Sequence, residues 1–141
     1  MQVNFLSKYI ILLSLFSSVA WAEKPLAPEQ LRGAIRIGAE DAAELIVNTP
    51  NLVVIDSRKD IEYSKGHIQG AISLLDTQMT LDLLSKHAPD KSAPVLFYCN
   101  GERCLRSSRA ATKALEWGYE TVYWFRGGWN EWVEKGMPVS R

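Results

Sequence analysis

The sequence predicts an α/β domain in three layers, with a central parallel sheet covered by helices on both faces. Short apolar runs alternate with segments whose apolar residues recur at helical spacing. The apolar runs show no polar alternation, which is typical of strands that are buried on both faces. Because strand and helix follow one another along the chain, the pattern favours parallel strands joined by helical crossovers.

Five strands are expected, of which the first is a short edge strand. They are Ile35–Ile37, Leu52–Asp56, Ala71–Leu75, Val95–Cys99 and Thr121–Phe125. The carboxyl ends of parallel strands lie at the same edge of a sheet, and ligands bind beyond that edge. Cys99 ends one of these strands, so it is expected at the edge where this architecture carries its chemistry.

Helical spacing predicts the layers on either side of the sheet. The expected helices are 39–48, 81–87, 107–117 and 129–135. The third of these is the clearest, because small apolar residues gather on one side and Gly118 follows as a natural C-terminal stop. The pair Gly127–Gly128 is interpreted as a sharp turn that brings the backbone close to the loop after Cys99.

The N-terminal segment Met1–Ala22 has the layout of a secretory signal peptide. Lys8 precedes an apolar run, and small residues around Ala20 and Ala22 form a cleavage site. The apolar run is shorter than the roughly 20 residues that a membrane-spanning helix needs. We therefore expect cleavage after Ala22, export to the periplasm, and no stable membrane association afterwards.

The remaining chain divides into a lead-in, residues 23–34, and one domain, residues 35–141. The full sequence has 16 basic and 16 acidic residues, and the signal peptide contains only Lys8 among them. Removing it leaves 15 basic and 16 acidic residues, a net charge of −1. A near-neutral chain without a basic cluster argues against nucleic-acid binding. Nothing in the pattern demands a second subunit, so a monomer is expected.

The loop that follows Cys99 is the strongest candidate for a reactive site. Cys99 and Cys104 are the only cysteines in the chain. A thiolate is favoured by neighbouring cations and by a helix N-terminus. Arg103 and Arg106 are expected within the loop, and a helix is expected to begin near Ser107. Loop N–H groups can also form an anion-binding nest, so a sulfur or oxygen anion is the expected ligand.

Several separated motifs together resemble the single-domain rhodaneses, which are sulfurtransferases. The resemblance extends from Ile35 to Val139. Its motifs are Asp56-x-Arg58, Glu62-Tyr63, Gly66-His67-Ile68-x-Gly70-Ala71, the cysteine loop, Gly118-Tyr119, and Arg126-Gly127-Gly128 followed by Trp132. The resemblance implies a rhodanese-like fold.

The resemblance further implies that Cys99 takes a sulfane sulfur from a small anionic donor such as thiosulfate. Cys99 would hold the sulfur as a persulfide and pass it to a nucleophilic acceptor such as a thiol, without a cofactor. The loop residues would bind the substrate: Asn100, Gly101, Glu102, Arg103, Cys104 and Arg106. A metal site is not expected, because two cysteines without a nearby histidine pair do not make four ligands.

The loop departs from the usual rhodanese spacing. An arginine normally lies five positions after the cysteine, whereas Arg106 lies seven positions after Cys99, so the loop is expected to be two residues longer. Taking Cys104 as the nucleophile and Arg109 as its arginine restores the spacing, but it moves the cysteine away from the strand end. Longer loops also occur in related phosphatases and arsenate reductases, so an oxyanion substrate remains an alternative.

The roles of the other candidates stay open. Cys104 is either a resolving cysteine, which forms a disulfide with Cys99, or a passive loop residue. In the first case the pair could also serve a redox module without sulfur transfer. Asp56 and Arg58 are expected to support the site, either by a structural ion pair or by hydrogen bonds within their loop. His67 is expected to stabilise a turn by a hydrogen bond rather than to act in catalysis.

Overall fold

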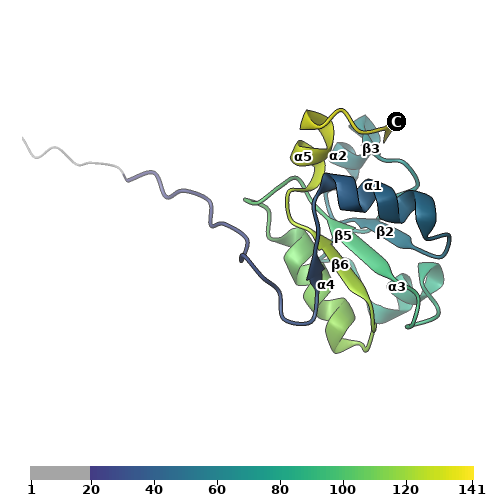
Figure 1. Ribbon diagram of the computed structural model, residues 1–141. Helices are drawn as coiled ribbons and strands as arrows, with labels where there is room; N and C mark the ends of the chain where they lie inside the picture. The colour runs from purple at the N-terminus through teal and green to yellow at the C-terminus, as the bar shows by residue number, and fades with distance from the viewer. Residues whose placement is uncertain (1–19) are drawn as a thin grey trace, which may run out of the picture.

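A computed structural model describes residues 20–141 of the chain (Figure 1). Residues 1–19, which hold most of the predicted signal peptide, lie outside the described part. The elements in chain order are β1 (Ile35–Arg36), α1 (Ala39–Asn48), β2 (Val53–Asp56), α2 (Asp60–Lys65), β3 (His67–Ile68), β4 (Ile72–Ser73), α3 (Leu81–His87), β5 (Val95–Tyr98), α4 (Arg106–Glu116), β6 (Val122–Phe125), α5 (Gly128–Glu134) and β7 (Val139–Ser140).

The main sheet has five strands in the order β1-β6-β5-β2-β4, and every neighbouring pair is parallel. All four residues of the central strand β5 are buried. β5 pairs with β2 from Val53↔Val95 to Asp56↔Tyr98, so the polar end of β2 lies beside the residue that precedes Cys99. The prediction of a parallel α/β sheet is confirmed.

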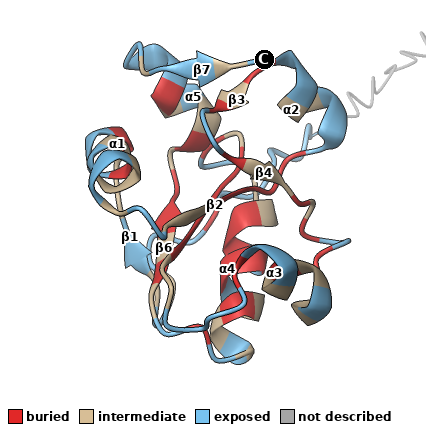
Figure 2. Cartoon of the chain, turned by 90° about the vertical axis from the view of Figure 1, so that its right-hand side faces the viewer, coloured by how far each residue is buried: buried red, intermediate tan, exposed pale blue. Residues whose placement is uncertain are grey.

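Apolar cores cover both faces of the sheet, because neighbouring residues of a strand point to opposite faces. Ile55 and Phe97 belong to the core shared with α3 and α4. Leu96 and Phe125 belong to the core shared with α1 and α5. In Figure 2, α1 turns its exposed side outward, and α4 is drawn largely as buried.

The expected helices are all present, with small shifts at their ends. The third begins at Arg106 rather than Ser107, so Arg106 belongs to the first turn of α4 and not to the loop. This helix ends as predicted before Gly118, whose N–H donates to Leu115. The strand expected at Ala71–Leu75 is reduced to two residues.

Sequence reasoning missed α2 and the small antiparallel sheet of β3 and β7. None of the residues of α2 is buried, so the helix leaves no apolar periodicity in the sequence. β3 and β7 have two residues each, which is too short to show a pattern. Between residues 20 and 141, no helix combines the length and hydropathy that a membrane crossing requires.

Candidate functional site

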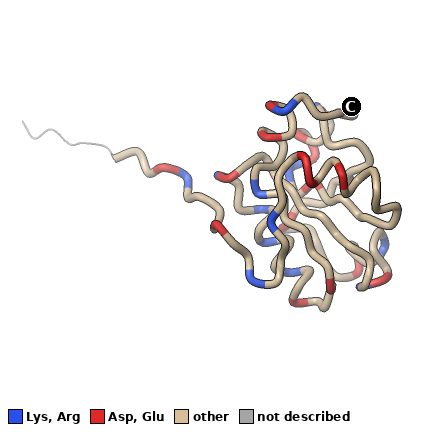
Figure 3. Tube along the Cα trace, in the orientation of Figure 1, with Lys and Arg blue, Asp and Glu red and all other residues tan. Residues whose placement is uncertain are grey.

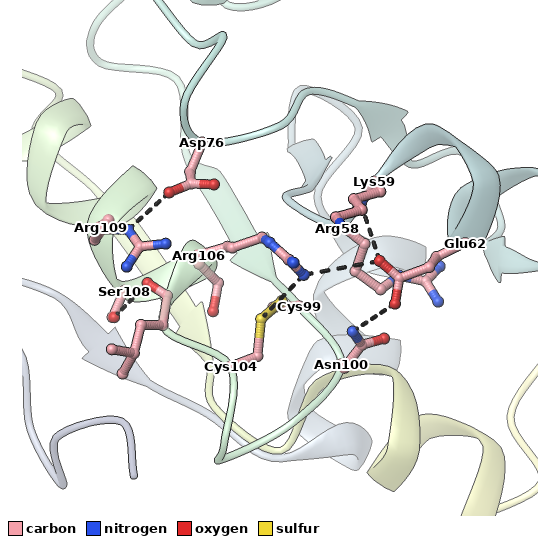
Figure 4. The surroundings of a disulfide bond; sticks show 12 residues. Arg58, Lys59, Glu62, Asp76, Cys99, Asn100, Cys104, Arg106, Ser108 and Arg109 are labelled. Atoms are coloured by element: carbon pink, nitrogen blue, oxygen red, sulfur yellow. Dashed lines mark hydrogen bonds and ion pairs between the residues drawn. A yellow bond between two sulfur atoms is a disulfide. The ribbon is translucent and has the colours of Figure 1, made fainter. Parts of the chain in front are cut away.

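The cysteine loop connects the end of β5 with the beginning of α4. Cys99 follows β5 directly and is only 1% exposed. A turn closes the middle of the loop, where the Cys104 N–H donates to Gly101 across 2.9 Å. Cys99 and Cys104 are joined by a disulfide with their Cα atoms 6.2 Å apart (Figure 4). The structure thus places both cysteines in one covalent unit at the carboxyl edge of the sheet.

The turn before α5 fixes the backbone of the cysteine loop from the opposite side. The Trp129 N–H donates to the Cys99 carbonyl and the Asn130 N–H to the Asn100 carbonyl, each across 2.8 Å. Gly128 has φ +56, and a Cβ there would overlap the Cys99 carbonyl. Only glycine therefore allows this close approach without displacing the loop. The expected contact between the double-glycine turn and the cysteine loop is present.

The first turn of α4 is anchored to the sheet. The indole N–H of the buried Trp124 donates to the Ser107 hydroxyl across 3.1 Å. Leu105 is the N-cap residue and makes no side-chain capping hydrogen bond, and α4 then runs for 11 residues from Arg106. Its N-terminal N–H groups carry partial positive charge toward the loop, which favours an anion at that position.

A polar cluster crosses the loop from the side of α2. Asn100 donates to Glu62 Oε1 across 2.8 Å, and Arg106 Nη1 lies 3.7 Å from Glu62 Oε2. Arg106 Nη1 also lies 3.8 Å from Cys104 Sγ. Figure 4 shows Arg106 reaching between the disulfide and Glu62. The cluster therefore holds one cation directly beside the sulfur of Cys104.

The environment of Glu62 keeps its carboxylate charged. Burial acts to raise the pKa of Glu62, but the hydrogen bonds from Asn100 and the Lys59 N–H act against it. The positive charges of Arg106 and Arg58 act in the same direction as those hydrogen bonds. The net result is a pKa of Glu62 below its ordinary value of 4.5.

Asp56 and Arg58 form a buried ion pair, with Arg58 Nη2 2.7 Å from Asp56 Oδ2. The Tyr98 hydroxyl donates to the same carboxylate across 2.6 Å. Burial, followed by the charge of Asp56, raises the pKa of Tyr98 far above its ordinary value, so the phenol stays protonated. The Arg58 guanidinium also stacks over Trp129, 4.6 Å from the ring centroid. The positive charge of Arg58 is thus neutralised inside the protein by Asp56. The contacts of this ion pair with Tyr98 and Trp129 connect the end of β2 with β5 and α5.

His67 lies in β3 and holds the end of α2. Its Nδ1 donates to the Tyr63 carbonyl across 3.0 Å, because a carbonyl oxygen can only accept. Its ring stacks on Tyr63 at a centroid distance of 3.7 Å. This geometry suits a residue that stabilises local structure.

A cavity of about 850 Å³ opens over the cysteine loop. All six residues expected to bind substrate line it: Asn100, Gly101, Glu102, Arg103, Cys104 and Arg106. Cys99 does not line the cavity, although its disulfide partner does. Asp56, Arg58 and His67 are not among the lining residues either, so the structure separates them from the space that a ligand would occupy.

The lead-in supplies a wall of the cavity that sequence reasoning missed. Lys24 and Pro25 line the cavity, and the Ala27 N–H donates to the Glu102 carbonyl across 2.6 Å. Arg103 Nη1 donates to the Lys24 carbonyl across 3.0 Å. The lead-in shows no motif or periodicity, so its sequence held no signal of this contact.

Arg126 joins the lead-in to the cysteine loop. Its side chain is 6% exposed and donates to the Ala27 and Pro28 carbonyls, each across 3.0 Å. It also contacts the carboxylates of Glu102 and Glu29, at 3.1 and 3.0 Å. In the sequence, Arg126 stood out only as part of the motif Arg126-Gly127-Gly128. In the structure, Arg126 links the lead-in to the cysteine loop, and both segments line the cavity.

Positive charge predominates around the cavity. Five lining side chains are cationic, namely those of Lys24, Lys59, Arg103, Arg106 and Arg109, and two are acidic. Figure 3 shows many of the basic segments on the side of the domain that the lead-in approaches. Within residues 20–141, no group of three or more histidine, cysteine or acidic side chains could hold a metal ion. The cationic lining suits an anionic ligand beside the sulfur of Cys104.

Comparisons with known proteins identify the family and the fold of this chain. The rhodanese-like domain family matches residues 38–135. A thiosulfate sulfurtransferase from Pseudomonas aeruginosa superposes with a TM-score of 0.68 at 26% identity, covering 78% of this chain and 21% of that one. A polysulfide-sulfur transferase from Wolinella succinogenes superposes with a TM-score of 0.63 at 24% identity, covering 77% and 80%, and so supports the fold.

Relatives at the sequence level carry varied names. A protein of Escherichia coli K12 named YibN and described as uncharacterized is 26% identical over 130 residues, covering 88% of this chain and 89% of its own. A tRNA uridine(34) hydroxylase of Erwinia tasmaniensis is 33% identical over 110 residues, covering 70% of this chain and 30% of its own. The family match spans most of the chain and includes β5, the cysteine loop after it and the turn at Gly127–Gly128. This chain belongs to the rhodanese-like domain family.

Proposed function

We propose that this protein is a sulfurtransferase that carries sulfane sulfur as a persulfide on Cys99. One observation carries the proposal: Cys99 follows a central strand directly, in a loop that ends at the N-terminus of α4 beneath a cavity with a cationic lining. The helix N-terminus and the nearby guanidinium of Arg106 favour the thiolate, which is the nucleophilic form. Thiosulfate is the proposed donor.

The first step requires the reduced enzyme. The Cys99 thiolate attacks the outer sulfur of thiosulfate, a sulfur–sulfur bond forms on Cys99, and the bond to the central sulfur breaks. Sulfite leaves with the electron pair of that bond, and the persulfide keeps the negative charge. The cationic lining supports this step because it attracts a dianion and stabilises charge on both sulfur atoms.

The second step passes the outer sulfur to a thiol. An acceptor thiolate attacks that sulfur, and Cys99 leaves again as a thiolate. Cys104 offers another outcome: its thiolate attacks the inner sulfur, the Cys99–Cys104 disulfide forms, and hydrosulfide leaves. The proximity of the two cysteines supports a resolving role of Cys104 in this cycle.

Mass spectrometry of the intact protein tests the proposal. Reduced protein freed of reductant is incubated with thiosulfate, and an increase by the mass of one sulfur atom is expected. The C99S variant should show no adduct, whereas C104S should keep the adduct for longer because the resolving thiol is absent. Equal adduct on C99S would contradict the assignment of Cys99.

A redox module is the second candidate function, and the Cys99–Cys104 disulfide favours it. In this case the pair would be oxidised and reduced without carrying sulfur. The disulfide would cycle readily, and no sulfane donor would leave an adduct. Turnover of a generic aryl phosphate would instead favour an oxyanion enzyme over both candidates.

We also propose that the protein is exported and works in the periplasm. The signal-peptide layout of residues 1–22 supports this proposal. N-terminal sequencing of protein from a periplasmic extract should begin at Glu23. A chain in the cytoplasmic fraction that still begins at residue 1 would contradict it.

A further inference from the structure

We infer that the cavity binds a small anionic thiol, which reduces the Cys99–Cys104 disulfide by attacking the sulfur of Cys104. The inference names a second substrate class for this pocket, beyond the sulfane donor. It rests on the disulfide and the cavity alone, so it does not depend on the proposed sulfur transfer.

Access distinguishes the two sulfur atoms. Thiol–disulfide exchange requires the attacking thiolate to approach one sulfur along the line of the S–S bond, from the side opposite the leaving sulfur. Cys99 is 1% exposed and is absent from the cavity lining, whereas Cys104 is partly exposed and lines the cavity. A thiol in the cavity therefore meets Cys104, and Cys99 becomes the leaving group.

The charges beside Cys104 select an anionic thiol. Arg106 Nη1 lies 3.8 Å from Cys104 Sγ, where it can attract an incoming thiolate. Some of the lining cations are paired, since Arg106 contacts Glu62 and Arg109 contacts Asp76.

Lys24 and Lys59 differ from these arginines. Neither lysine takes part in an ion pair within the described part of the chain. Their charges are consequently available to the carboxylates of a ligand. A thiol with carboxylates should gain from both lysines, while a cationic thiol should be repelled.

The size of the cavity favours a thiol larger than thiosulfate. A volume of about 850 Å³ falls in the range that accommodates ligands of drug size. Ile61, Leu105 and Pro25 add apolar surface to the otherwise charged lining. A short peptide thiol, with a carbon skeleton and terminal carboxylates, matches both features.

The lead-in completes the proposed site. Arg126 binds the Ala27 and Pro28 carbonyls, and Arg103 binds the Lys24 carbonyl. These contacts hold Lys24 at the rim of the cavity. The lead-in lies before residues 38–135, the range that the family model matches, so this wall lies outside the matched family core.

The exchange balances with two thiols. The first thiolate forms a mixed disulfide with Cys104, and the S–S bond breaks so that Cys99 leaves as a thiolate. The second thiolate attacks the ligand sulfur of the mixed disulfide and releases Cys104 as a thiolate. Two thiols are oxidised to one disulfide, and the protein disulfide takes up the two electrons.

The first experiment identifies the attacked sulfur in the wild-type protein. Oxidised protein is mixed with glutathione, quenched with excess N-ethylmaleimide after short intervals, digested and analysed by mass spectrometry. The expected product carries glutathione on Cys104 and maleimide on Cys99. A majority of the reverse product, with glutathione on Cys99, would overturn the inference.

The second experiment tests the charge of the ligand. Rates of disulfide reduction are measured with anionic glutathione and cationic cysteamine, each corrected for its thiolate fraction. We expect a preference for glutathione of about tenfold at low salt, falling as salt is added. The variant K24Q/K59Q should lose about three- to fivefold of this preference, since two charges close to the ligand are removed.

The matched control is K86Q, because Lys86 is exposed on α3 and does not line the cavity. It should leave the preference unchanged. An equal preference in K24Q/K59Q and wild type would overturn the proposed binding site. Rapid reduction by a thioredoxin-type protein, without any preference for glutathione over cysteamine, would overturn the inference and identify a protein, and not a small thiol, as the reductant.

Discussion

Replacing Gly128 by alanine should displace the cysteine loop and destabilise the fold. A methyl group at this position would overlap the Cys99 carbonyl oxygen and lie 3.0 Å from the Cys99 carbonyl carbon and 3.2 Å from that of Asn100. All three atoms belong to the backbone of the loop, so no flexible side chain can move aside. The loop and α5 must separate to relieve the overlap.

Two contributions determine how much the free energy of unfolding falls in G128A. The φ of +56 at Gly128 costs a non-glycine residue about 1–2 kcal/mol. Separation also weakens the hydrogen bonds from Trp129 to Cys99 and from Asn130 to Asn100, each worth about 1 kcal/mol. The free energy of unfolding of G128A should therefore fall by about 3–4 kcal/mol.

Gly136 provides a control that isolates the backbone contribution. Its φ is +66, and a Cβ there would have no neighbour within 4 Å. The variant G136A should lose only about 1–2 kcal/mol. Urea unfolding of both variants gives the comparison. If the free energies of unfolding of G128A and G136A differ by less than about 0.5 kcal/mol, the close approach of α5 to the loop does not constrain the fold, and the reasoning is refuted.

Two other predictions concern charged groups. D56N leaves the buried Arg58 without its partner and should lower the free energy of unfolding by about 3–5 kcal/mol, while D56N/R58M should recover much of this loss in the same urea titration. The second concerns Glu62, whose pKa is lower in the folded protein than its ordinary value of 4.5. Its contribution to the free energy of unfolding is therefore complete above pH 4.5 and is lost as the pH falls through the pKa of the folded state. The difference in stability between wild type and E62Q should shrink between about pH 6 and pH 3, and a difference that grows on acidification would contradict the sign of the shift.

Local pattern was sufficient to predict the sheet and most of its helices. A strand buried on both faces needs an uninterrupted apolar run, which is why Val95–Tyr98 was visible in the sequence. The position of Cys99 at the end of that run followed directly. An ion pair between Asp56 and Arg58 was one of the expected arrangements, because two residues that close together at the end of one strand are near each other in space, and the structure contains it.

Contacts between distant segments could not be read in the same way. Glu62 meets Asn100 across 38 positions, and no spacing rule applies to such a pair. Arg126 and Ala27 are separated by 99 positions, and the lead-in around Ala27 has no periodicity of its own. The wall that Lys24 adds to the cavity depends on these contacts, so it emerged only from the folded chain.

By itself, the sequence determined the parallel sheet, the place of Cys99 at its carboxyl edge and the composition of the loop, because apolar runs and turn residues act over short distances. The tertiary structure decided that Cys99 is buried while Cys104 faces the cavity, and that the lead-in forms part of the site. The physical reason is that exposure depends on which remote segments cover a residue. Here those segments are the turn at Gly128 and the lead-in held by Arg126.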